Sequence, residues 1–511
     1  MALLTYSSAW WDVNSTSFFL VLALLWFSSL LLKKFTQNAQ NSLPPGPIGI
    51  PLLGSLPFIN GDLHSYFTAT AKTYGPIFSL RLGNKIGVVI STSSVAREVL
   101  KDKDIIFANR DATIAGKVVF YGGSDILWSS YGPEWRMLRK VCTREMLSGS
   151  MVDSFHDIRR REVRKMVNSL WVRRMSPVDV GEEIFMTVLN IITNILWGGS
   201  GNEVAERSLG TELRTAVDEI SVLLGKPNIS DFFPCLAYFD LQGIEKQSKK
   251  MVKRFDNVFE LMIDERTRLE DNNKKDFLQA LLNLRKGGGD AKTSLTITHI
   301  KGLLMDMVMG GTALTSSTME FMLAEMMNNP DVMNKAQQEL EVVVGANNMV
   351  EESHIHKLPY LHAVMKETLR LHPGAPLLAP HCSSESCPIG GITIPKGALV
   401  FINVWAIQRD PSNWEDPLKF DPERFMKSEW DFCGNDFKYF PFGSGRRICV
   451  GIETAERIFV FLLASLIHSF EWKVSHGEEL DLEETISIGL KKKKPLIAIP
   501  TPRFLDEALY E

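Results

Sequence analysis

Residues 442–451 read FGSGRRICVG and set one cysteine, Cys449, in a glycine-rich turn near the end of the chain. Arg446 and Arg447 precede the cysteine, and Gly451 follows its neighbour. Backbone N–H groups and positive charge lower the pKa of a thiol, and the thiolate is the form that binds a metal. Glycines let a chain run close to a bound group without Cβ clashes. We therefore predict that Cys449 is a metal ligand rather than a buried structural cysteine.

Two charged motifs lie upstream of this loop. Glu367 and Arg370 (ETLR) are three residues apart, which places them on one face of a helix. Such a pair is common on surface helices and contributes little there. Arg424 follows in the motif DPERF, between that helix and the cysteine loop. A further arginine in this position allows a larger, buried charge cluster.

A third motif, WRMLR, contains Trp135 and Arg139. Residues four apart share a helical face. The guanidinium fork of an arginine can hold both oxygens of a carboxylate. Taken alone, W-x-x-x-R is an unspecific pattern, and it gains weight only from its place before the other motifs.

In the order W-x-x-x-R, E-x-x-R, P-E-R-F and F-x-x-G-x-R-x-C-x-G, the chain resembles the cytochromes P450 over its whole length. The resemblance is to the plant microsomal type, and within it to the sesquiterpene-oxidising group that includes cadinene hydroxylase and valencene oxidase. It implies haem b (iron protoporphyrin IX) as the cofactor and Cys449 as the iron ligand, whose thiolate would favour O–O cleavage.

The resemblance also implies roles for the motif residues. The expected contacts of the haem propionates are Trp135, Arg139, His381 and Arg447. His381 stands where related chains often have an arginine. The expected structural ion-paired triad is Glu367, Arg370 and Arg424. Removing one partner of such a buried set would leave a charge unpaired, at a cost of about 3–5 kcal/mol.

Hydrophobic periodicity predicts a mainly α fold with a minor β part. Residues 77–82 and 85–90, around Gly83-Asn84, predict a β-hairpin. Long amphipathic helices are predicted over 155–173, 180–197, 246–270, 296–328 and 331–345. Residues 392–397 and 399–402 suggest a small second sheet. These features agree with the cytochrome P450 fold, a single large haem domain behind an N-terminal transmembrane helix.

The N-terminus is the compositional outlier. Residues 17–32 carry no charge, and Trp10 and Trp11 lie where an interfacial aromatic belt would be. A cleaved signal peptide has positive charge before its apolar run, whereas here Lys33 and Lys34 follow it. A buried core helix is the other alternative. We predict a membrane anchor over 1–34, a polar and Pro-rich linker over 35–47, and the haem-thiolate catalytic domain over 48–511.

Charge and cysteine content limit the partners. The net charge of −4 and the pI of about 6.3 give no electrostatic case for nucleic acid. The scattered cysteines suit a reducing compartment. Lysines after the anchor predict that the bulk of the protein faces the cytosol. The resemblance implies a single-pass protein of the endoplasmic reticulum membrane, with NADPH–cytochrome P450 reductase and a small apolar substrate as partners.

The segment MDMVMGGTALTSSTMEFM, residues 305–322, departs from the family pattern. It resembles the long distal helix that crosses the haem, where an acid and a threonine usually deliver protons for oxygen activation. Here those positions are Ala313 and Leu314, which carry no ionisable proton. Thr312 and Thr315 remain as candidate catalytic residues, but they lie on other faces of the helix. Protons could come from a substrate hydroxyl or an ordered water, held for example by Thr315.

The expected function is that of a haem-thiolate monooxygenase that oxidises a small apolar plant metabolite, a sesquiterpene-like terpenoid, with O2 and NADPH-derived electrons. The alternatives are a non-oxidative haem-thiolate dehydratase or isomerase and an inactive haem- or ligand-binding protein. By family position, candidate pocket-lining residues are 118–121, 312–315, 375–379 and 486–489.

Overall fold

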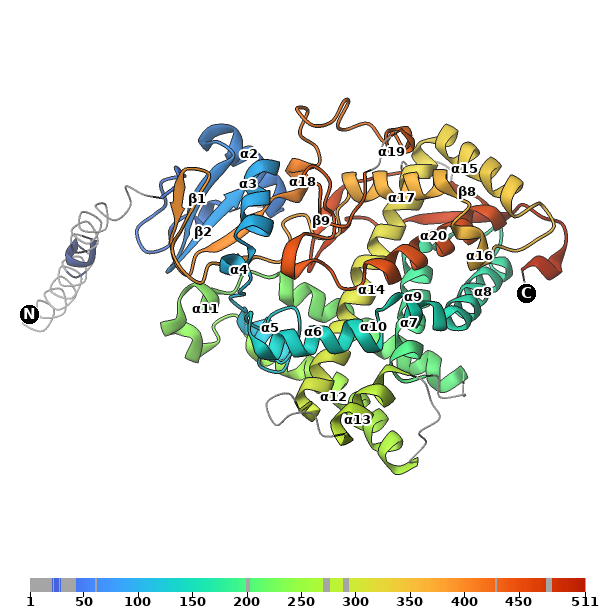
Figure 1. The fold of residues 1–511 in the computed structure, drawn as a ribbon, viewed down its shortest axis with the longest axis horizontal. Helices are drawn as coiled ribbons and strands as arrows, with labels where there is room; N and C mark the ends of the chain where they lie inside the picture. The colour runs from blue at the N-terminus through green and yellow to red at the C-terminus, as the bar shows by residue number, and fades with distance from the viewer. Residues whose placement is uncertain are drawn as a thin grey trace, which may run out of the picture.

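The computed structural model describes residues 21, 23–26, 28, 43–59, 62–198, 203–269, 276–287, 294–427, 430–474 and 480–510. Helices make up most of this part of the chain, and the first strands lie to one side of them (Figure 1). The helices are α2 (Leu63–Tyr74), α3 (Ser93–Arg97), α4 (Asp104–Phe107), α5 (Ile114–Val119), α6 (Pro133–Glu145), α7 (Gly149–Ser154), α8 (His156–Val172), α9 (Val180–Trp197), α10 (Glu203–Gly225), α11 (Ile229–Phe232), α12 (Ile244–Leu269), α13 (Phe277–Lys286), α14 (Ile297–Asn328), α15 (Pro330–Val343), α16 (Glu352–Ile355), α17 (Pro359–Leu371), α18 (Val404–Ile407), α19 (Glu423–Met426) and α20 (Ile452–Ser469). The strands are β1 (Ile77–Leu82), β2 (Lys85–Ile90), β3 (Val178–Asp179), β4 (His381–Cys382), β5 (Cys387–Ile389), β6 (Ile392–Ile394), β7 (Leu399–Ile402), β8 (Phe470–Val474), β9 (Glu484–Ile486), β10 (Leu490–Lys492) and β11 (Ile497–Pro502).

The predicted amphipathic segments form α8, α9, α12, α14 and α15, and the predicted hairpin forms β1 and β2. The expected second sheet is wrong for residues 399–402. This strand, β7, pairs in parallel with β2 and gives a sheet of order β1-β2-β7-β4, whereas β6 forms a separate hairpin with β5. The four residues of β7 are all buried. A continuous apolar run of this kind is typical of an interior strand, which needs a partner on each side.

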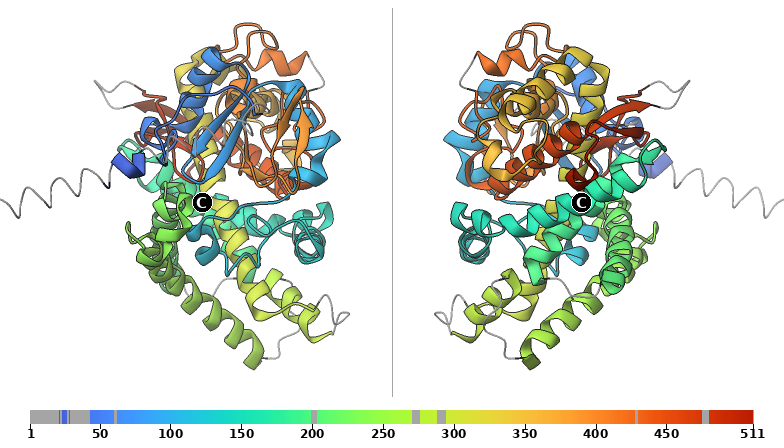
Figure 2. Two further views of the ribbon diagram at one scale, coloured as in Figure 1. Left: turned by 90° about the vertical axis from the view of Figure 1, so that its left-hand side faces the viewer. Right: turned by 90° about the vertical axis from the view of Figure 1, so that its right-hand side faces the viewer.

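Helix α14 runs through the middle of the molecule in each view (Figures 1 and 2). The Thr296 hydroxyl caps its start by accepting from the His299 N–H. The helix is apolar around most of its circumference because α9, α17 and α20 cover it. A Cβ at Gly311 would lie only 3.0 Å from the side chain of Ile192 in α9. The glycine therefore lets α9 approach α14 closely.

Among the described residues, α9 is the helix long and apolar enough to cross a membrane, but 61% of it is buried inside the fold. It is therefore a core helix. The predicted anchor lies mostly outside the described residues; those described within it, 21, 23–26 and 28, are helical and exposed.

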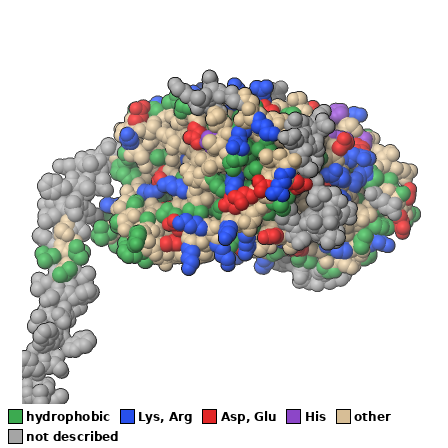
Figure 3. All heavy atoms as spheres, turned by 90° about the horizontal axis from the view of Figure 1, so that it is seen from below, with side chains coloured by type: hydrophobic (Ala, Val, Ile, Leu, Met, Phe, Trp, Pro, Cys, Tyr) green, Lys and Arg blue, Asp and Glu red, His purple; other side chains and the backbone are tan. Residues whose placement is uncertain are grey.

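The described end of the predicted linker, residues 43–47, lies along β1. Ser79 donates from its backbone to the Pro45 carbonyl at 2.9 Å and from its hydroxyl to the Pro44 carbonyl at 2.7 Å. A Cβ at Gly46 would lie 1.9 Å from the Ser79 carbonyl oxygen, so only glycine fits there. On the face seen from below, lysines and arginines are interspersed with acidic and apolar side chains (Figure 3). Charges of one sign therefore do not dominate the electrostatic potential of this face.

Candidate active site

The cysteine loop is shaped by glycines in the left-handed region. Gly443 and Gly445 have φ values of +75° and +67°. A Cβ at Gly445 would lie 1.9 Å from the Leu100 carbonyl oxygen, which excludes any other residue. The Cys449 N–H donates to the Phe442 carbonyl at 3.0 Å, and the Gly451 N–H donates to the Cys449 sulfur at 3.4 Å. The loop therefore presents one sulfur in a fixed direction.

Cys449 has an exposed side chain, yet protein surrounds its sulfur closely enough that burial is the largest effect on its pKa. Burial raises the pKa of Cys449, and the opposing effects of the Gly451 N–H and Arg139 are smaller. The Gly451 N–H and Arg139 lower this pKa as predicted, but in the protein alone burial outweighs them. A bound metal cation would supply the missing stabilisation, so metal binding at this sulfur is coupled to proton release.

Arg139 and Arg447 both lie against the Trp135 ring, with guanidinium carbons 5.5 and 4.4 Å from its centroid. Arg139 donates to the Ile448 carbonyl, next to the cysteine, at 2.7 Å. The Trp135 indole N–H donates to the Ile126 carbonyl at 3.0 Å. Trp135 therefore holds two arginines in place, while its own N–H group is already paired.

Arg447 is anchored by three backbone carbonyls. It donates to Ala108 at 2.7 Å, to Ile126 at 3.0 Å and to Ser129 at 2.6 Å. A guanidinium carries five N–H groups, so two remain for another acceptor. Burial lowers the pKa of Arg447 to about 10. It stays charged at neutral pH.

His381, in β4, is buried, and its Nδ1 lies 2.8 Å from the Phe107 carbonyl oxygen. A carbonyl can only accept, so Nδ1 carries the proton. Burial, followed by repulsion from Arg110 and Arg447, holds the pKa of His381 well below its usual range. His381 is therefore neutral in the protein alone and would gain a proton if an anion bound beside it.

Arg110 is a site residue that sequence analysis missed. Its side chain is buried and donates to the Ala379 and Pro380 carbonyls at 2.6 and 2.9 Å. Its buried Nε has no hydrogen-bond partner among the residues that the structure describes. Burial, with repulsion from Arg447, lowers the pKa of Arg110 to about 9. The only signal in the sequence is an arginine that follows the apolar run 105–108 and Asn109, which is too weak to assign.

The cationic side chains fit a dianionic cofactor. Arg110, Arg139 and Arg447 are positive, and the carboxyl group that attracts both Arg110 and Arg447 is Asp125. Burial raises the pKa of Asp125 to about 7, so it balances less than one of these charges at neutral pH. More than two positive charges therefore remain, beside the Arg110 Nε that lacks a partner among the described residues and an accessible cysteine. The two propionates of haem b would accept from the guanidinium N–H groups, and its iron would bind the cysteine thiolate, so the site fits haem b.

Glu367, Arg370 and Arg424 are brought together between α17 and α19. Arg370 binds Glu367 through two N–H groups at 2.7 and 2.9 Å, and Arg424 Nε donates to the same carboxylate at 3.0 Å. Glu367 and Arg370 are fully buried. The cluster joins the segment before the cysteine loop to α17.

On α14, Gly310 is exposed, and a Cβ there would meet nothing within 4 Å. One turn later, Leu314 fills the space beside two other glycines: a Cβ at Gly489 would lie 2.0 Å from its Cδ2, and one at Gly374 would lie 3.7 Å from its Cβ. Thr312 is fully buried and donates its hydroxyl to the Val308 carbonyl at 2.7 Å. The proton of Thr312 is therefore held within the helix.

The segment 374–380 joins the two faces of the site. The Gly374 carbonyl accepts from the Leu490 N–H at 2.9 Å, beside Leu314. At its other end Leu378, in the left-handed region with φ +52°, lies 3.7 Å from the position of a Cβ on Gly443. The segment therefore forms a wall between α14 and the cysteine loop.

Known proteins share this arrangement. Residues 44–499 match the family model of cytochrome P450. The chain is 39% identical to flavonoid 3′-monooxygenase of Arabidopsis thaliana, covering 95% of this chain and 97% of that one, and 38% identical to geraniol 8-hydroxylase of Catharanthus roseus, covering 94% and 99%. A zebrafish cytochrome P450 solved with progesterone superposes with a TM-score of 0.76 at 25% identity, covering 87% of this chain and all of that one.

These findings confirm the fold, the haem b cofactor and a reductase-dependent monooxygenase. The relatives named act on a flavonoid and on a terpenoid, so they support a small organic substrate without selecting its class. By its cysteine loop, its fold and its relatives, the chain belongs to the cytochrome P450 family, among the plant monooxygenases.

Proposed function

We propose that this cytochrome P450 oxidises a small apolar plant metabolite, with a terpenoid of sesquiterpene size as the expected substrate. The observation that carries the proposal is the surface of α14 beside the open position at Gly310. Ala313 and Leu314 replace an acid and a threonine, and Leu314 packs against Gly374 and Gly489. A wall of this kind orients a hydrocarbon by shape. Similarity to geraniol 8-hydroxylase, a terpenoid enzyme, supports the same class.

In this proposal, Cys449 binds the iron, and Arg110, Arg139, His381 and Arg447 hold the propionates. Trp135, whose own N–H is paired with Ile126, positions Arg139 and Arg447. Haem supplies an iron that activates oxygen for insertion into a C–H bond. The chain's residues position the substrate and exclude water, with Leu314 covering one side. The side-chain hydroxyl of Thr315 makes no hydrogen bond to another described residue, and the residue is 7% exposed. Its hydroxyl is therefore available to hold a water or a substrate hydroxyl that supplies protons.

Non-oxidative chemistry is the second candidate, and Ala313-Leu314 is the observation that favours it. Oxygen activation needs protons, and general acid catalysis typically contributes 10²–10⁴-fold, or about 3–5 kcal/mol of barrier. A dehydratase or isomerase would not need that delivery.

The deciding experiment uses membranes that contain the protein and a reductase. These are incubated with NADPH and a panel of sesquiterpenes, geraniol and a flavonoid, under labelled oxygen and under anaerobic conditions. We expect a labelled product from a sesquiterpene that requires both NADPH and oxygen. Unlabelled product formed without NADPH would establish the non-oxidative reading. Labelled product from the flavonoid alone would overturn the substrate class.

Two variants complete this design. Cys449→Ser is expected to abolish product and the thiolate Soret shift of the reduced CO complex, which ties any product to the proposed ligand. The double variant Ala313→Asp, Leu314→Thr restores an acid-threonine pair. We expect it to raise the ratio of product formed to NADPH consumed. An unchanged ratio would mean that proton delivery at these positions is not limiting.

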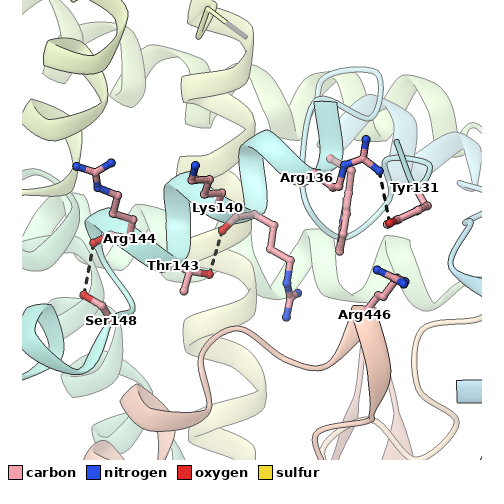
Figure 4. A pocket seen from close by; sticks show the side chains of 9 residues that line it. Tyr131, Arg136, Lys140, Thr143, Arg144, Ser148 and Arg446 are labelled. Carbon is pink, nitrogen blue, oxygen red and sulfur yellow. Dashed lines mark hydrogen bonds between the residues drawn. The ribbon is translucent and has the colours of Figure 1, made fainter. Parts of the chain in front are cut away.

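We further propose that the electron donor docks over α6. A hollow of about 570 Å³ is lined there by basic side chains. Arg136, Lys140 and Arg144 project from successive turns of α6, and Arg446 approaches from the cysteine loop (Figure 4). Arg139, also in the lining, donates to Ile448 beside Cys449. Acidic partner surfaces are attracted to such a face.

Lys140→Glu tests this docking face. We expect an increased KM for the reductase and a weaker dependence of the reduction rate on salt, with substrate binding unchanged. Lys250→Glu, an exposed substitution on α12, is the matched control of equal charge change. Equal effects of the two variants would exclude docking over α6.

We propose that the protein is a single-pass protein of the endoplasmic reticulum membrane with its catalytic domain in the cytosol. Exposed apolar side chains near the N-terminal segment support this. Ile48 and Leu52 precede β1, and Tyr238, Phe239 and Leu241 follow α11. A hydrogen bond of 3.1 Å from the Asn84 N–H to the Phe232 carbonyl joins the two regions. Retention in alkali-washed microsomes, with digestion of the catalytic domain by added protease, is the expected result. Release by the wash would contradict the anchor.

A further inference from the structure

Two buried carboxyl groups hold one short turn between α5 and α6. The Asp125 carboxyl accepts from the Trp128 and Ser129 N–H groups at 3.1 and 2.9 Å. Asp306, which comes from α14, accepts from the Ile126 N–H at 2.7 Å. The next N–H, of Leu127, is a second backbone donor to Asp306. The N–H groups of this turn, residues 125–129, therefore face two carboxyl groups, one of them on the distal helix.

The carbonyl groups of the same turn hold the haem-site residues. Ile126 accepts from Arg447 at 3.0 Å and from the Trp135 indole at 3.0 Å, and Ser129 accepts from Arg447 at 2.6 Å. Ile126 thus donates its N–H to Asp306 and accepts from Arg447 through its carbonyl. A shift of Ile126 would therefore displace both its contact with Asp306 and its contact with Arg447.

The contact between the turn and α14 is close enough to require a glycine. A Cβ at Gly302 would lie 2.0 Å from the Ser124 carbonyl oxygen. Gly302 is one helical turn before Asp306, so both are on the face that meets the turn. Gly310 and Leu314 continue that spacing along α14 toward the distal side. The helix that shapes the substrate side therefore also fixes the turn that holds Arg447.

We propose that Asp306, together with Asp125, is a positioning residue for the haem: the two carboxyl groups fix the turn 125–129, and the turn fixes Arg447 and Trp135 against the propionates. The proposal concerns retention of the cofactor, so it does not depend on the substrate proposed above.

The electrostatics of the pair add a pH dependence. Burial, the larger cause, and mutual repulsion raise the pKa of Asp306 well above its usual range, and burial raises that of Asp125 to about 7. The charged or titratable groups facing them are Arg447 and Arg110 near Asp125, and Cys142 near Asp306. The pKa of Cys142 is raised by burial, so this thiol stays neutral. As pH rises above neutral, Asp125 ionises and offsets the positive charge available to the propionates.

The test measures the rate at which the purified, haem-loaded protein releases haem to an excess of apo-globin, followed by the Soret band between about pH 6 and 9. Asp306→Leu removes the acceptor for Ile126. We expect release to accelerate by about tenfold or more at neutral pH, because a buried N–H is left unpaired. Asp306→Asn keeps an acceptor oxygen and is expected to release haem at nearly the wild-type rate. Asp125→Asn cannot ionise and is expected to flatten the increase in release above neutral pH.

Asp231 offers a matched control. Its carboxylate, on α11, also accepts a backbone N–H from another segment at 2.7 Å, that of Ile114, and burial also raises its pKa. Asp231→Leu should destabilise the protein without selectively accelerating haem release. In the background Arg447→Lys, Asp306→Leu should add little, since both act on one contact.

Equal release rates in wild type and Asp306→Leu would overturn the proposal, as would independent, multiplying effects of Asp306→Leu and Arg447→Lys. If Asp306→Leu does not fold, the pH profile of Asp125→Asn decides, because a profile identical to that of wild type contradicts the proposed role. None of these readouts requires product formation, so they are unaffected by a wrong substrate assignment.

Discussion

Replacement of Arg370 by lysine is the sharpest test of how the site is supported. Arg370 uses all five of its N–H groups: two bind Glu367, and the others reach the carbonyls of Gln408, Pro417 and Lys419 at 2.9, 2.7 and 3.2 Å. A lysine has three N–H groups, so Arg370→Lys removes at least two of these buried, charge-assisted hydrogen bonds. At about 1–3 kcal/mol for each, the expected loss of unfolding free energy is about 2–6 kcal/mol.

The assay is urea unfolding of the solubilised protein, followed by tryptophan fluorescence. Trp414 is a local reporter, because the Arg370 guanidinium lies 5.2 Å from its ring centroid. Arg457→Lys is the matched control. Arg457 is 39% exposed and binds Asp153 at 2.8 Å, so its replacement should cost less than about 1 kcal/mol. The reduced CO spectrum should show loss of the thiolate signal in Arg370→Lys at urea concentrations where the control retains it.

A loss in Arg370→Lys no larger than that in the control would refute the reasoning. It would mean that the buried acceptors find water or that the segment relaxes around the shorter side chain. Failure of the variant to accumulate would itself be consistent with the expected loss, since total stability is about 5–15 kcal/mol. In that case Glu367→Asp, which keeps the charge but shortens the reach, provides the measurable intermediate.

Three further predictions concern separate parts of the fold. Burial raises the pKa of Glu320 to about 7, above its ordinary 4.5. The free energy of unfolding should therefore fall by roughly 3 kcal/mol as the pH rises between these two values. Urea unfolding of Glu320→Gln at several pH values should lack this pH dependence. Gly445→Ala would place a Cβ 1.9 Å from a backbone carbonyl at φ +67°, so we expect loss of the thiolate CO spectrum while the helical circular dichroism is retained. Tyr121→Phe removes the 2.9 Å hydrogen bond from the Tyr121 hydroxyl to Asp256. We expect faster amide hydrogen exchange in α5 and a loss of about 1 kcal/mol of unfolding free energy. Unchanged exchange would mean that this hydrogen bond does not hold α5 to α12.

The spacing of apolar residues along the chain was sufficient to predict many of the helices and strands. Period-3.6 apolar residues predicted α8 and α15 with ends close to those observed, because an amphipathic helix records its buried face in the sequence. The partner of β7 was not predictable in this way. A short apolar run records that a strand is buried but not which strand lies beside it, and β2 is far away in the chain.

Within the site, motif residues were predicted and supporting residues were missed. Cys449 and Arg139 belong to patterns with fixed spacing. Arg110 and Asp306 do not, although their burial and contacts place them at the same site. The net direction of the pKa shift at Cys449 was also not predictable from sequence. The loop's N–H groups and arginines are visible in the sequence, but the larger effect, burial, depends on everything packed around the sulfur.

The sequence by itself determined the cofactor chemistry, because a thiolate in a loop with fixed glycines and arginines is specified by residues adjacent in the chain. It also showed that the distal helix lacks its usual acid and threonine. Only the tertiary structure decided how the site is assembled: that Leu314 fills the space at Gly374 and Gly489, that Arg110 joins the cationic cluster, and that Asp306 reaches the turn that holds Arg447. These contacts join residues far apart in the chain, and their energies depend on burial and exclusion of water, which arise only when the helices and loops pack together.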